Sequence, residues 1–159
     1  MKNRGKSFEQ VIREAFLKVP DVSIDRIPDQ TMRYRGAKNI CDFIVYKKPY
    51  EYYIECKSVH GASLPFTNIS ETQWEGLLEK SKIQGVFAGV MCWWVDKNVT
   101  KFLPIQMLQN FYELGMKSIN WEDPDPRIIT VQGKKKRVFF DYDMDGFFHS
   151  IEKGQRRQV

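Results

Sequence analysis

Apolar side chains at helical spacing mark three segments of the chain. Residues 8–18 carry apolar side chains three and four positions apart, and Ser7 with Gln10 forms the S-x-x-Q pattern of a capping box. Ser70 and Gln73 repeat this pattern in front of a second apolar stripe. A third stripe follows a proline, which is favoured at the first position of a helix. The sequence therefore predicts three amphipathic helices.

Alternating or continuous apolar runs indicate the strands. Residues 22–27 alternate weakly, and the runs 41–46 (CDFIVY) and 51–57 (EYYIECK) flank KKPY in the manner of a β-hairpin. The run 86–95 is apolar on both faces, as is typical of a central strand covered by helices. The order of these elements, αβββαβ, predicts an α/β fold in which helices flank a sheet.

The last part of the chain, residues 116–159, has a different pattern. RIITV and RVFFDYD are strand-like around the basic turn QGKKK, and HSIEKGQRRQV is expected to be a frayed basic tail. The length of 159 residues suits a single domain. We expect its core at about residues 5–115, with the C-terminal hairpin and tail as an accessory part.

The register of the first hairpin brings two acidic residues together. A two-residue or a four-residue turn within KKPY pairs Tyr46 with Glu51, which places Asp42 opposite Glu55. Because side chains alternate across a strand, Lys57 shares the face of the two carboxylates. The other face is apolar and is formed by Cys41, Phe43, Val45, Tyr52, Ile54 and Cys56.

Opposed carboxylates require a positive partner. Directly opposed strand positions lie about 5 Å apart at Cβ, where two carboxylates repel each other. Asp42 and Glu55 therefore predict a Mg²⁺ site, because this ion binds one or two carboxylates and keeps places for water and phosphate oxygens. Lys57 is suited to hold the attacking water and to offset charge on the phosphate. An isolated E-x-K also occurs on solvated strand faces, so this structural alternative stays open.

The composition favours a polyanionic partner. Twenty-five Lys and Arg against twenty Asp and Glu give a net charge of +5, which suits phosphate contacts but also keeps a protein soluble. Three cysteines without CxxC spacing and two histidines predict neither a zinc site nor a disulfide framework, and a cytoplasmic location is expected. No signal peptide or membrane span is predicted, because the longest apolar run is too short.

Three motifs occur in a recognisable order: GKSFEQ, an Asp followed after twelve residues by ECK, and SLPFTNISETQ before the buried strand. Through them the sequence resembles the RecU-type Holliday junction resolvases of the PD-(D/E)xK nuclease superfamily, over roughly residues 5–112. The resemblance implies a restriction-endonuclease-like mixed sheet. By analogy, the small size suits a phage-encoded enzyme, which would act in the host cytoplasm.

The resemblance implies roles for five residues. Asp42 and Glu55 match the principal metal ligands, and Lys57 matches the catalytic lysine. Glu9 matches an acidic residue that helps to complete the metal site, and Gln73 matches a glutamine that assists near the scissile phosphate. Two structural alternatives stay open: Glu9 only pairs with an arginine one helical turn later, and Gln73 only caps its helix.

The candidate DNA contacts lie in a loop and at a hairpin tip. RecU proteins carry a long stalk between the first strand and the catalytic Asp, whereas this chain has only DQTMRYRGAKNI in that interval. The loop is expected either to contact phosphates and stack on bases or to be an ordinary solvated loop. The candidate DNA-binding residues are Arg33, Tyr34, Arg35, Lys38, Lys47 and Lys48.

These observations together lead us to expect a Mg²⁺-dependent endodeoxyribonuclease, with Mn²⁺ as a substitute, that cleaves four-way or other branched DNA. A homodimer is expected, because resolving a junction requires paired cuts that a two-fold dimer supplies. Two alternatives remain. One is a nuclease of the same fold that acts on another DNA structure, and the other is a non-catalytic DNA-binding module.

Overall fold

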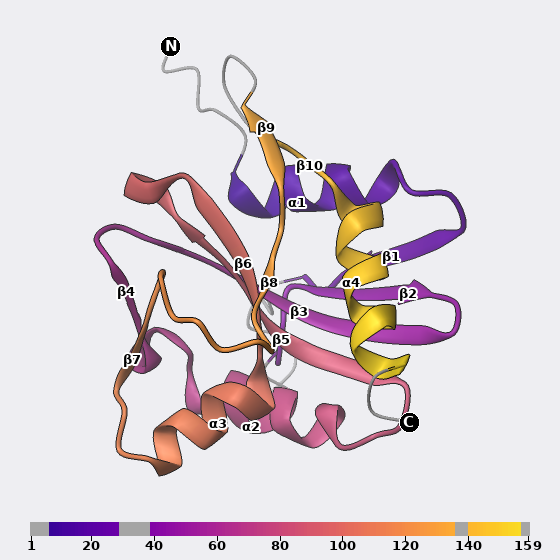
Figure 1. Ribbon diagram of the computed structural model, residues 1–159. Helices are drawn as coiled ribbons and strands as arrows, with labels where there is room; N and C mark the ends of the chain where they lie inside the picture. The colour runs from indigo at the N-terminus through magenta and orange to yellow at the C-terminus, as the bar shows by residue number, and fades with distance from the viewer. Residues whose placement is uncertain (1–6, 29–38, 136–139, 157–159) are drawn as a thin grey trace.

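A six-stranded mixed sheet forms the centre of the protein. The computed structural model describes residues 7–28, 39–135 and 140–156 (Figure 1). Neighbouring strands are antiparallel except for the central pair β3 and β5, which are parallel. The strand order is β1 (Val22–Arg26), β2 (Phe43–Lys47), β3 (Tyr50–Val59), β5 (Val86–Trp94), β6 (Val99–Pro104) and β8 (Ile129–Thr130).

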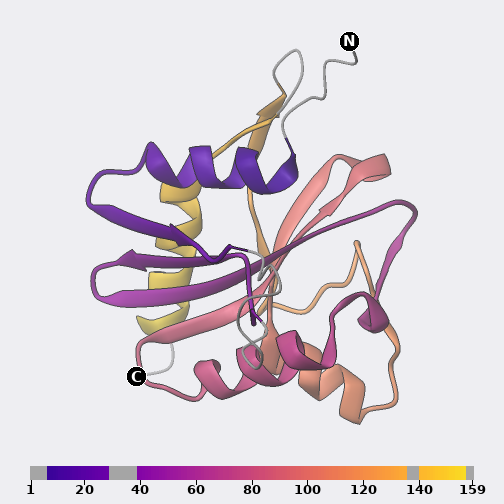
Figure 2. The same cartoon turned by 180° about the vertical axis from the view of Figure 1, so that it is seen from behind.

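Helices cover both faces of this sheet (Figures 1 and 2). Helices α1 (Phe8–Leu17) and α4 (Met144–Arg156) pack in one hydrophobic cluster on one face. Helices α2 (Glu71–Ser81) and α3 (Ile105–Glu113) pack in a second cluster on the other face. The predicted α/β fold is confirmed, with a mixed sheet between helices and the αβββαβ order in α1, β1, β2, β3, α2 and β5.

Smaller elements surround the central sheet. Strand β4 (Ser63–Pro65) pairs with β7 (Ser118–Asn120), and β9 (Gly133–Lys135) pairs with β10 (Phe140–Tyr142). Short 3-10 turns follow β4 and β5, at Phe66–Asn68 and Val95–Lys97. Among the described residues, no helix combines the length and the apolar character needed to cross a membrane.

Both predicted capping boxes are present. The Ser7 hydroxyl accepts from the amide of Gln10 at 3.3 Å, and the Gln10 side chain accepts from the amide of Ser7 at 3.1 Å. Ser70 and Gln73 make the same reciprocal pair at the start of α2. Each box satisfies two backbone donors that the first turn of a helix leaves open, so the sequence pattern fixes where both helices begin.

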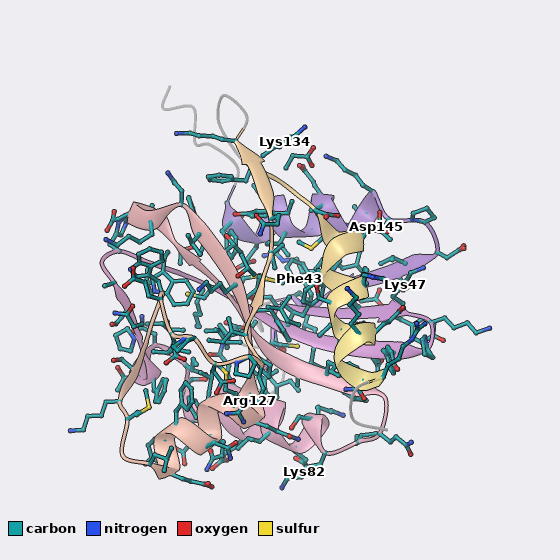
Figure 3. All side chains as sticks on the ribbon, viewed as in Figure 1. Phe43, Lys47, Lys82, Arg127, Lys134 and Asp145 are labelled. Atoms are coloured by element: carbon teal, nitrogen blue, oxygen red, sulfur yellow. The ribbon has the colours of Figure 1, made fainter. Side chains whose placement is uncertain are left out.

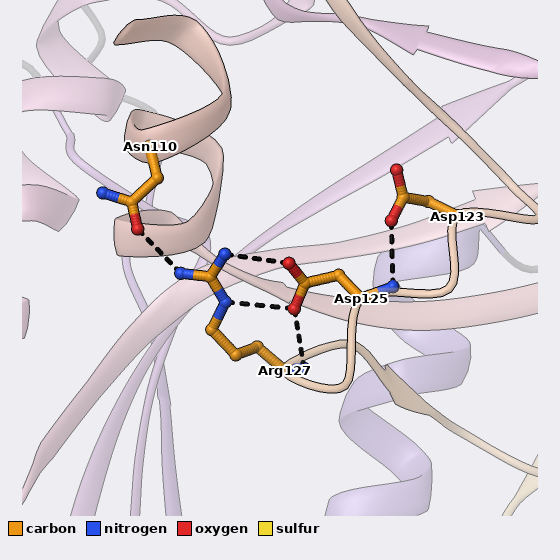
Figure 4. A network of polar contacts seen from close by, with 4 residues as sticks. All are labelled: Asn110, Asp123, Asp125 and Arg127. Carbon is orange, nitrogen blue, oxygen red and sulfur yellow. Dashed lines mark hydrogen bonds and ion pairs between the residues drawn. The ribbon is translucent and has the colours of Figure 1, made fainter. Parts of the chain in front are cut away.

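The loop between β7 and β8 is fixed by Arg127 (Figure 4). The guanidinium donates to both carboxylate oxygens of Asp125, at 3.0 and 2.8 Å, and to the Asn110 side chain on α3 at 2.7 Å. Asp123 accepts from the amide of Asp125 at 3.0 Å. These contacts hold the acidic loop against α3 just before the chain enters β8.

The expected frayed tail at residues 149–159 is wrong for residues 149–156, which belong to helix α4 (Met144–Arg156), while residues 157–159 lie outside the described residues. Its apolar residues Met144, Phe147, Phe148 and Ile151 follow a helical period and are buried. The Asp143 carboxylate accepts from the amide of Gly146 at 2.9 Å, as an N-cap residue does. A polar sequence after residue 151 hid this period, and burial against α1 stabilises the helix.

The expected C-terminal hairpin has a different pairing. RIITV supplies β8, which extends the central sheet by pairing with β6, rather than pairing with RVFFDYD. The hairpin is formed instead by β9, inside the basic turn segment, and β10. The prediction of a hairpin in this region is correct, but its first strand lies a few residues later than expected.

Candidate active site

The β2–β3 hairpin has the predicted register up to the candidate site. Tyr46 pairs with Glu51 and Phe43 with Ile54. The amide of Asp42 also donates to the Ile54 carbonyl, at 3.1 Å. Two residues of one strand therefore face one residue of the other, which is the pattern of a β-bulge. Asp42 and Glu55 are thus neighbours across a bulge rather than a directly opposed pair.

The bulge explains why the prediction for Cys41 is wrong. Cys41 does not share the apolar face of Phe43, but is buried in the second cluster with Tyr53 and Leu77. One extra residue in a strand reverses the side-chain alternation beyond it. The remaining residues predicted for that face, Phe43, Val45, Tyr52, Ile54 and Cys56, do lie together in the first cluster.

Asp42 is held by the backbone of the neighbouring strand. Its Oδ2 accepts from the amide of Cys56 at 2.8 Å, and its carbonyl accepts from the amide of Ile27 at 2.9 Å. Asp42 therefore contacts both sequence neighbours of Glu55, Cys56 through its carboxylate and Ile54 through its backbone amide. The carboxylates of Asp42 and Glu55 interact directly, and this contact contributes to the raised pKa of Glu55.

Glu55 is the buried centre of the site. The residue is only 4% exposed, yet its Oε1 accepts from Lys57 Nζ at 3.1 Å and from Gln73 Nε2 at 2.9 Å. Burial and then the negative charge of Asp42 raise the pKa of Glu55 from 4.5 to about 7, while the charge of Lys57 opposes this rise. Two donors on one oxygen fix the carboxylate orientation.

Gln73 caps its helix as predicted and also contacts Glu55. It completes the capping box of α2 through its Oε1 and donates to Glu55 through its Nε2. The two contacts use opposite ends of one amide, so the capping contact aims the other end at Glu55. The geometry therefore links the start of α2 to the site on β3.

Glu9 is paired with an arginine in the structure. It is in the first turn of α1, on the other face of the sheet, and its Oε2 lies 3.5 Å from Arg26 Nη2 on β1. After burial, the negative charges of Asp42, Glu55 and Glu9 raise the pKa of the Cys56 thiol. Within residues 7–28, 39–135 and 140–156, no three His, Cys, Asp or Glu side chains are grouped closely enough to hold a metal ion.

The pair of carboxylates nevertheless fits a divalent cation. Asp42 and Glu55 bring two hard oxygen donors together, and their repulsion raises the pKa of Glu55. Mg²⁺ takes one or two carboxylates in sites where water and phosphate oxygens fill its other positions. Two protein ligands therefore suffice for such a site, and an ion between them would remove the repulsion.

Of the six candidate DNA-binding residues, only two lie in the part of the chain that the structure describes. Arg33, Tyr34, Arg35 and Lys38 lie outside the described residues. Lys47 and Lys48 lie at the tip of the β2–β3 hairpin, where Lys47 Nζ donates to the Pro20 carbonyl at 3.5 Å. Lys57 is seven residues further along β3 than Tyr50, about 23 Å at 3.3 Å per residue. The tip is therefore remote from the candidate site.

The ion pair between Arg26 and Glu9 was not predicted from the sequence. This pairing joins β1 to α1, two elements whose relative placement no local pattern encodes. The weak alternation of residues 22–27 predicted the strand but not which face its arginine occupies. The ion pair is well exposed, so its contribution to stability is small.

We expect Glu55→Gln to change how the stability of the metal-free protein depends on pH. Between pH 4.5 and about 7 the folded state binds more protons than the unfolded state, so wild-type stability falls as pH rises. Glutamine cannot titrate but still accepts from Lys57 and Gln73. The variant should be more stable than wild type by about 1–3 kcal/mol at pH 8, and similar at pH 4.5.

Urea unfolding in EDTA at pH 4.5, 6 and 8 measures this difference. If the free energy of unfolding changed with pH in the same way for both proteins, Glu55 would not be the residue with the raised pKa.

Gln73→Ala and Gln10→Ala separate capping from a role at the site. Both glutamines complete a capping box, but only Gln73 also contacts Glu55. We expect each variant to lose about 0.5–1 kcal/mol of stability. For the endonuclease expected from the sequence, only Gln73→Ala should also slow DNA cleavage, by about tenfold, because a misaligned Glu55 weakens the site.

Thermal unfolding and single-turnover cleavage of the two variants provide the measurements. Equal cleavage rates in both would leave Gln73 with its capping role alone.

Similar solved structures include the 1.6 Å structure of Hjc, a Holliday junction resolvase from the archaeal hyperthermophile Archaeoglobus fulgidus. The TM-score is 0.46 and the sequence identity 18%, with 69% of this chain and 79% of that chain covered. No protein-family model matches the sequence, and no curated protein matches it.

Proposed function

We propose that this chain is a metal-dependent endodeoxyribonuclease that hydrolyses phosphodiester bonds in branched DNA, with the four-way Holliday junction as its substrate. The observation that supports it most strongly is the convergence of Asp42, Lys57 and Gln73 on the buried carboxylate of Glu55. A buried acid with a raised pKa, a second acid and a lysine are typical of a catalytic site rather than of a solvated strand face.

Asp42 and Glu55 are the proposed ligands of Mg²⁺, for which Mn²⁺ would substitute. When bound, such an ion lowers the pKa of a water molecule and offsets negative charge on the phosphate. Glu9, which the resemblance to RecU-type resolvases implies as a further ligand, pairs with Arg26 in the structure. We propose that it completes the site only after its side chain leaves Arg26.

Lys57 and Gln73 have separate proposed roles. The Lys57 side chain is 22% exposed, against 6% for that of Glu55, so its ammonium lies between the buried carboxylate and solvent. From there it can orient the attacking water and donate to a phosphate oxygen as negative charge develops. Gln73 holds Glu55 in one orientation, since it donates to the same oxygen as Lys57.

A homodimer is part of this proposal. Junction resolution needs two cuts in strands related by a two-fold axis, and a C2 dimer presents two sites in that relation. The resemblance to RecU-type resolvases supplies the junction as substrate. The net charge of +5 is consistent with a DNA partner.

The test compares a synthetic four-way junction with linear duplex of the same sequence, in Mg²⁺ and in EDTA. The proposal predicts symmetric nicks in the junction, only in Mg²⁺ or Mn²⁺. Equal or faster cleavage of the duplex would favour a nuclease with another DNA substrate. Binding of the junction without cleavage in either metal would show a non-catalytic DNA-binding module.

A further inference from the structure

We propose that the β9–β10 hairpin is a DNA-binding arm that contacts the phosphate backbone next to the cut through Lys134 and Lys135. This inference rests on the proposed function, because it assumes that DNA occupies the site around Glu55. Both lysines are exposed on β9, and the hairpin projects past the helix α1 (Figures 1 and 2).

The base of the hairpin is firmly attached to the body of the protein. Tyr142 is buried, and its hydroxyl lies 2.8 Å from the Thr100 hydroxyl on β6. Phe140 stacks on Tyr142, with ring centroids 5.8 Å apart. Lys18, directly after α1, donates to Asp141 at 2.6 Å. An arm anchored on a strand and a helix holds its lysines in place, which limits the entropy lost on binding.

Aromatic contacts place this base at the site end of the sheet. The Phe8 ring lies 5.7 Å from Trp93 and 6.3 Å from Tyr142. Trp93 on β5 pairs in register with Ser58 on β3, which directly follows Lys57. The hairpin therefore rises from the same end of the central parallel strands as the candidate catalytic lysine.

The charge on the hairpin is suited to phosphates. Lys134 pairs in register with Asp141, while Lys135 pairs with Phe140. The Asp141 carboxylate forms an ion pair with Lys18, which lies outside the hairpin. Strands β9 and β10 themselves carry two lysines and one aspartate, and exposed lysines bind DNA by releasing counterions from the backbone.

A second lysine pair provides a matched control. Lys80 and Lys82 at the end of α2 carry the same charge, and Lys82 lies far from Lys134 (Figure 3). Helix α2 leads into the start of β5, whereas Trp93 lies near the end of that strand. If the arm binds the DNA beside the cut, removing Lys134 and Lys135 should weaken binding much more than removing Lys80 and Lys82. A response to net charge alone would be the same for both pairs.

The experiment measures binding of a labelled four-way junction in EDTA at several salt concentrations. For Lys134→Gln/Lys135→Gln we expect a Kd several-fold higher than wild type. The slope of log Kd against log salt concentration should be smaller by about 2, close to one unit per lost phosphate contact. Lys80→Gln/Lys82→Gln should stay within about twofold of wild type.

Equal effects of the two pairs, or an unchanged salt slope in the arm variant, would overturn the proposal. Because EDTA prevents cleavage, the binding result is independent of catalysis. If an arm variant binds the junction like wild type and still cleaves it, the proposed DNA-binding arm is refuted and the proposed nuclease function stands. If the binding results support the arm but the wild-type protein does not cleave the junction in Mg²⁺, the proposed nuclease function is refuted instead.

Discussion

Asp42→Asn is expected to reduce DNA cleavage by about a thousandfold or more while leaving the protein folded. The variant loses a carboxylate ligand, and metal assistance supplies several kcal/mol to phosphodiester hydrolysis, where each 1.36 kcal/mol is a factor of ten. Asparagine retains a carbonyl oxygen that can accept from the amide of Cys56, so the bulge at the end of β2 should persist.

The same substitution removes the negative charge beside Glu55. Because Asp42 is one cause of the raised pKa of Glu55, this pKa should fall in the variant. Metal-free Asp42→Asn should therefore unfold at the same or a higher urea concentration than wild type near pH 8.

Asp96→Asn is the matched control for charge. Asp96 is exposed after β5, where it accepts from Gly61 and pairs with His60 rather than with the candidate site. This control should cleave at a rate close to wild type. Junction cleavage in Mg²⁺ with saturating enzyme is the measurement, and unchanged cutting by Asp42→Asn would remove Asp42 from the metal site.

Lys57→Ala should lower the cleavage rate by about a hundredfold or more with little change in junction affinity. The ammonium lies 3.1 Å from Glu55 and is positioned to act on the attacking water and the phosphate. One lysine among twenty-five basic residues contributes little to non-specific DNA binding. A loss in rate at saturating enzyme, without a loss in affinity, identifies an interaction made in the transition state.

Lys97→Ala is the control for this prediction. Lys97 is exposed in the turn after β5 and lies over the Trp121 ring, away from Glu55. Single-turnover rates and Kd values in EDTA should separate the two variants. If Lys57→Ala weakened binding and left the single-turnover rate unchanged, the lysine would be a DNA contact and not a catalytic group.

Local patterns explain how much of the fold was predictable. The turn within KKPY fixes the register of the first hairpin, and two capping boxes fix the starts of α1 and α2. The bulge at Asp42 was not predictable, because a period-2 pattern carries no signal for an inserted residue. Helix α4 was missed because its apolar period spans a glycine and ends in a basic, polar sequence.

Parts of the site were predictable for the same reason. Glu55 and Lys57 are two residues apart on one strand and share a face, and the register of the hairpin brings Asp42 next to Glu55. The contact of Gln73 with Glu55 depends on how α2 packs on β3, which only the tertiary structure shows. The pairing of Glu9 with Arg26 likewise depends on how α1 lies over β1.

Calorimetric titration of the DNA-free protein with Mn²⁺ at pH 7 tests the metal site most directly. We expect one ion per chain in wild type, and binding lost in both Asp42→Asn and Glu55→Gln. Binding should release protons, since burial and Asp42 raise the pKa of Glu55 to about 7, so the heat should vary with the buffer. Equal Mn²⁺ binding by wild type and both variants would contradict a cation held between Asp42 and Glu55.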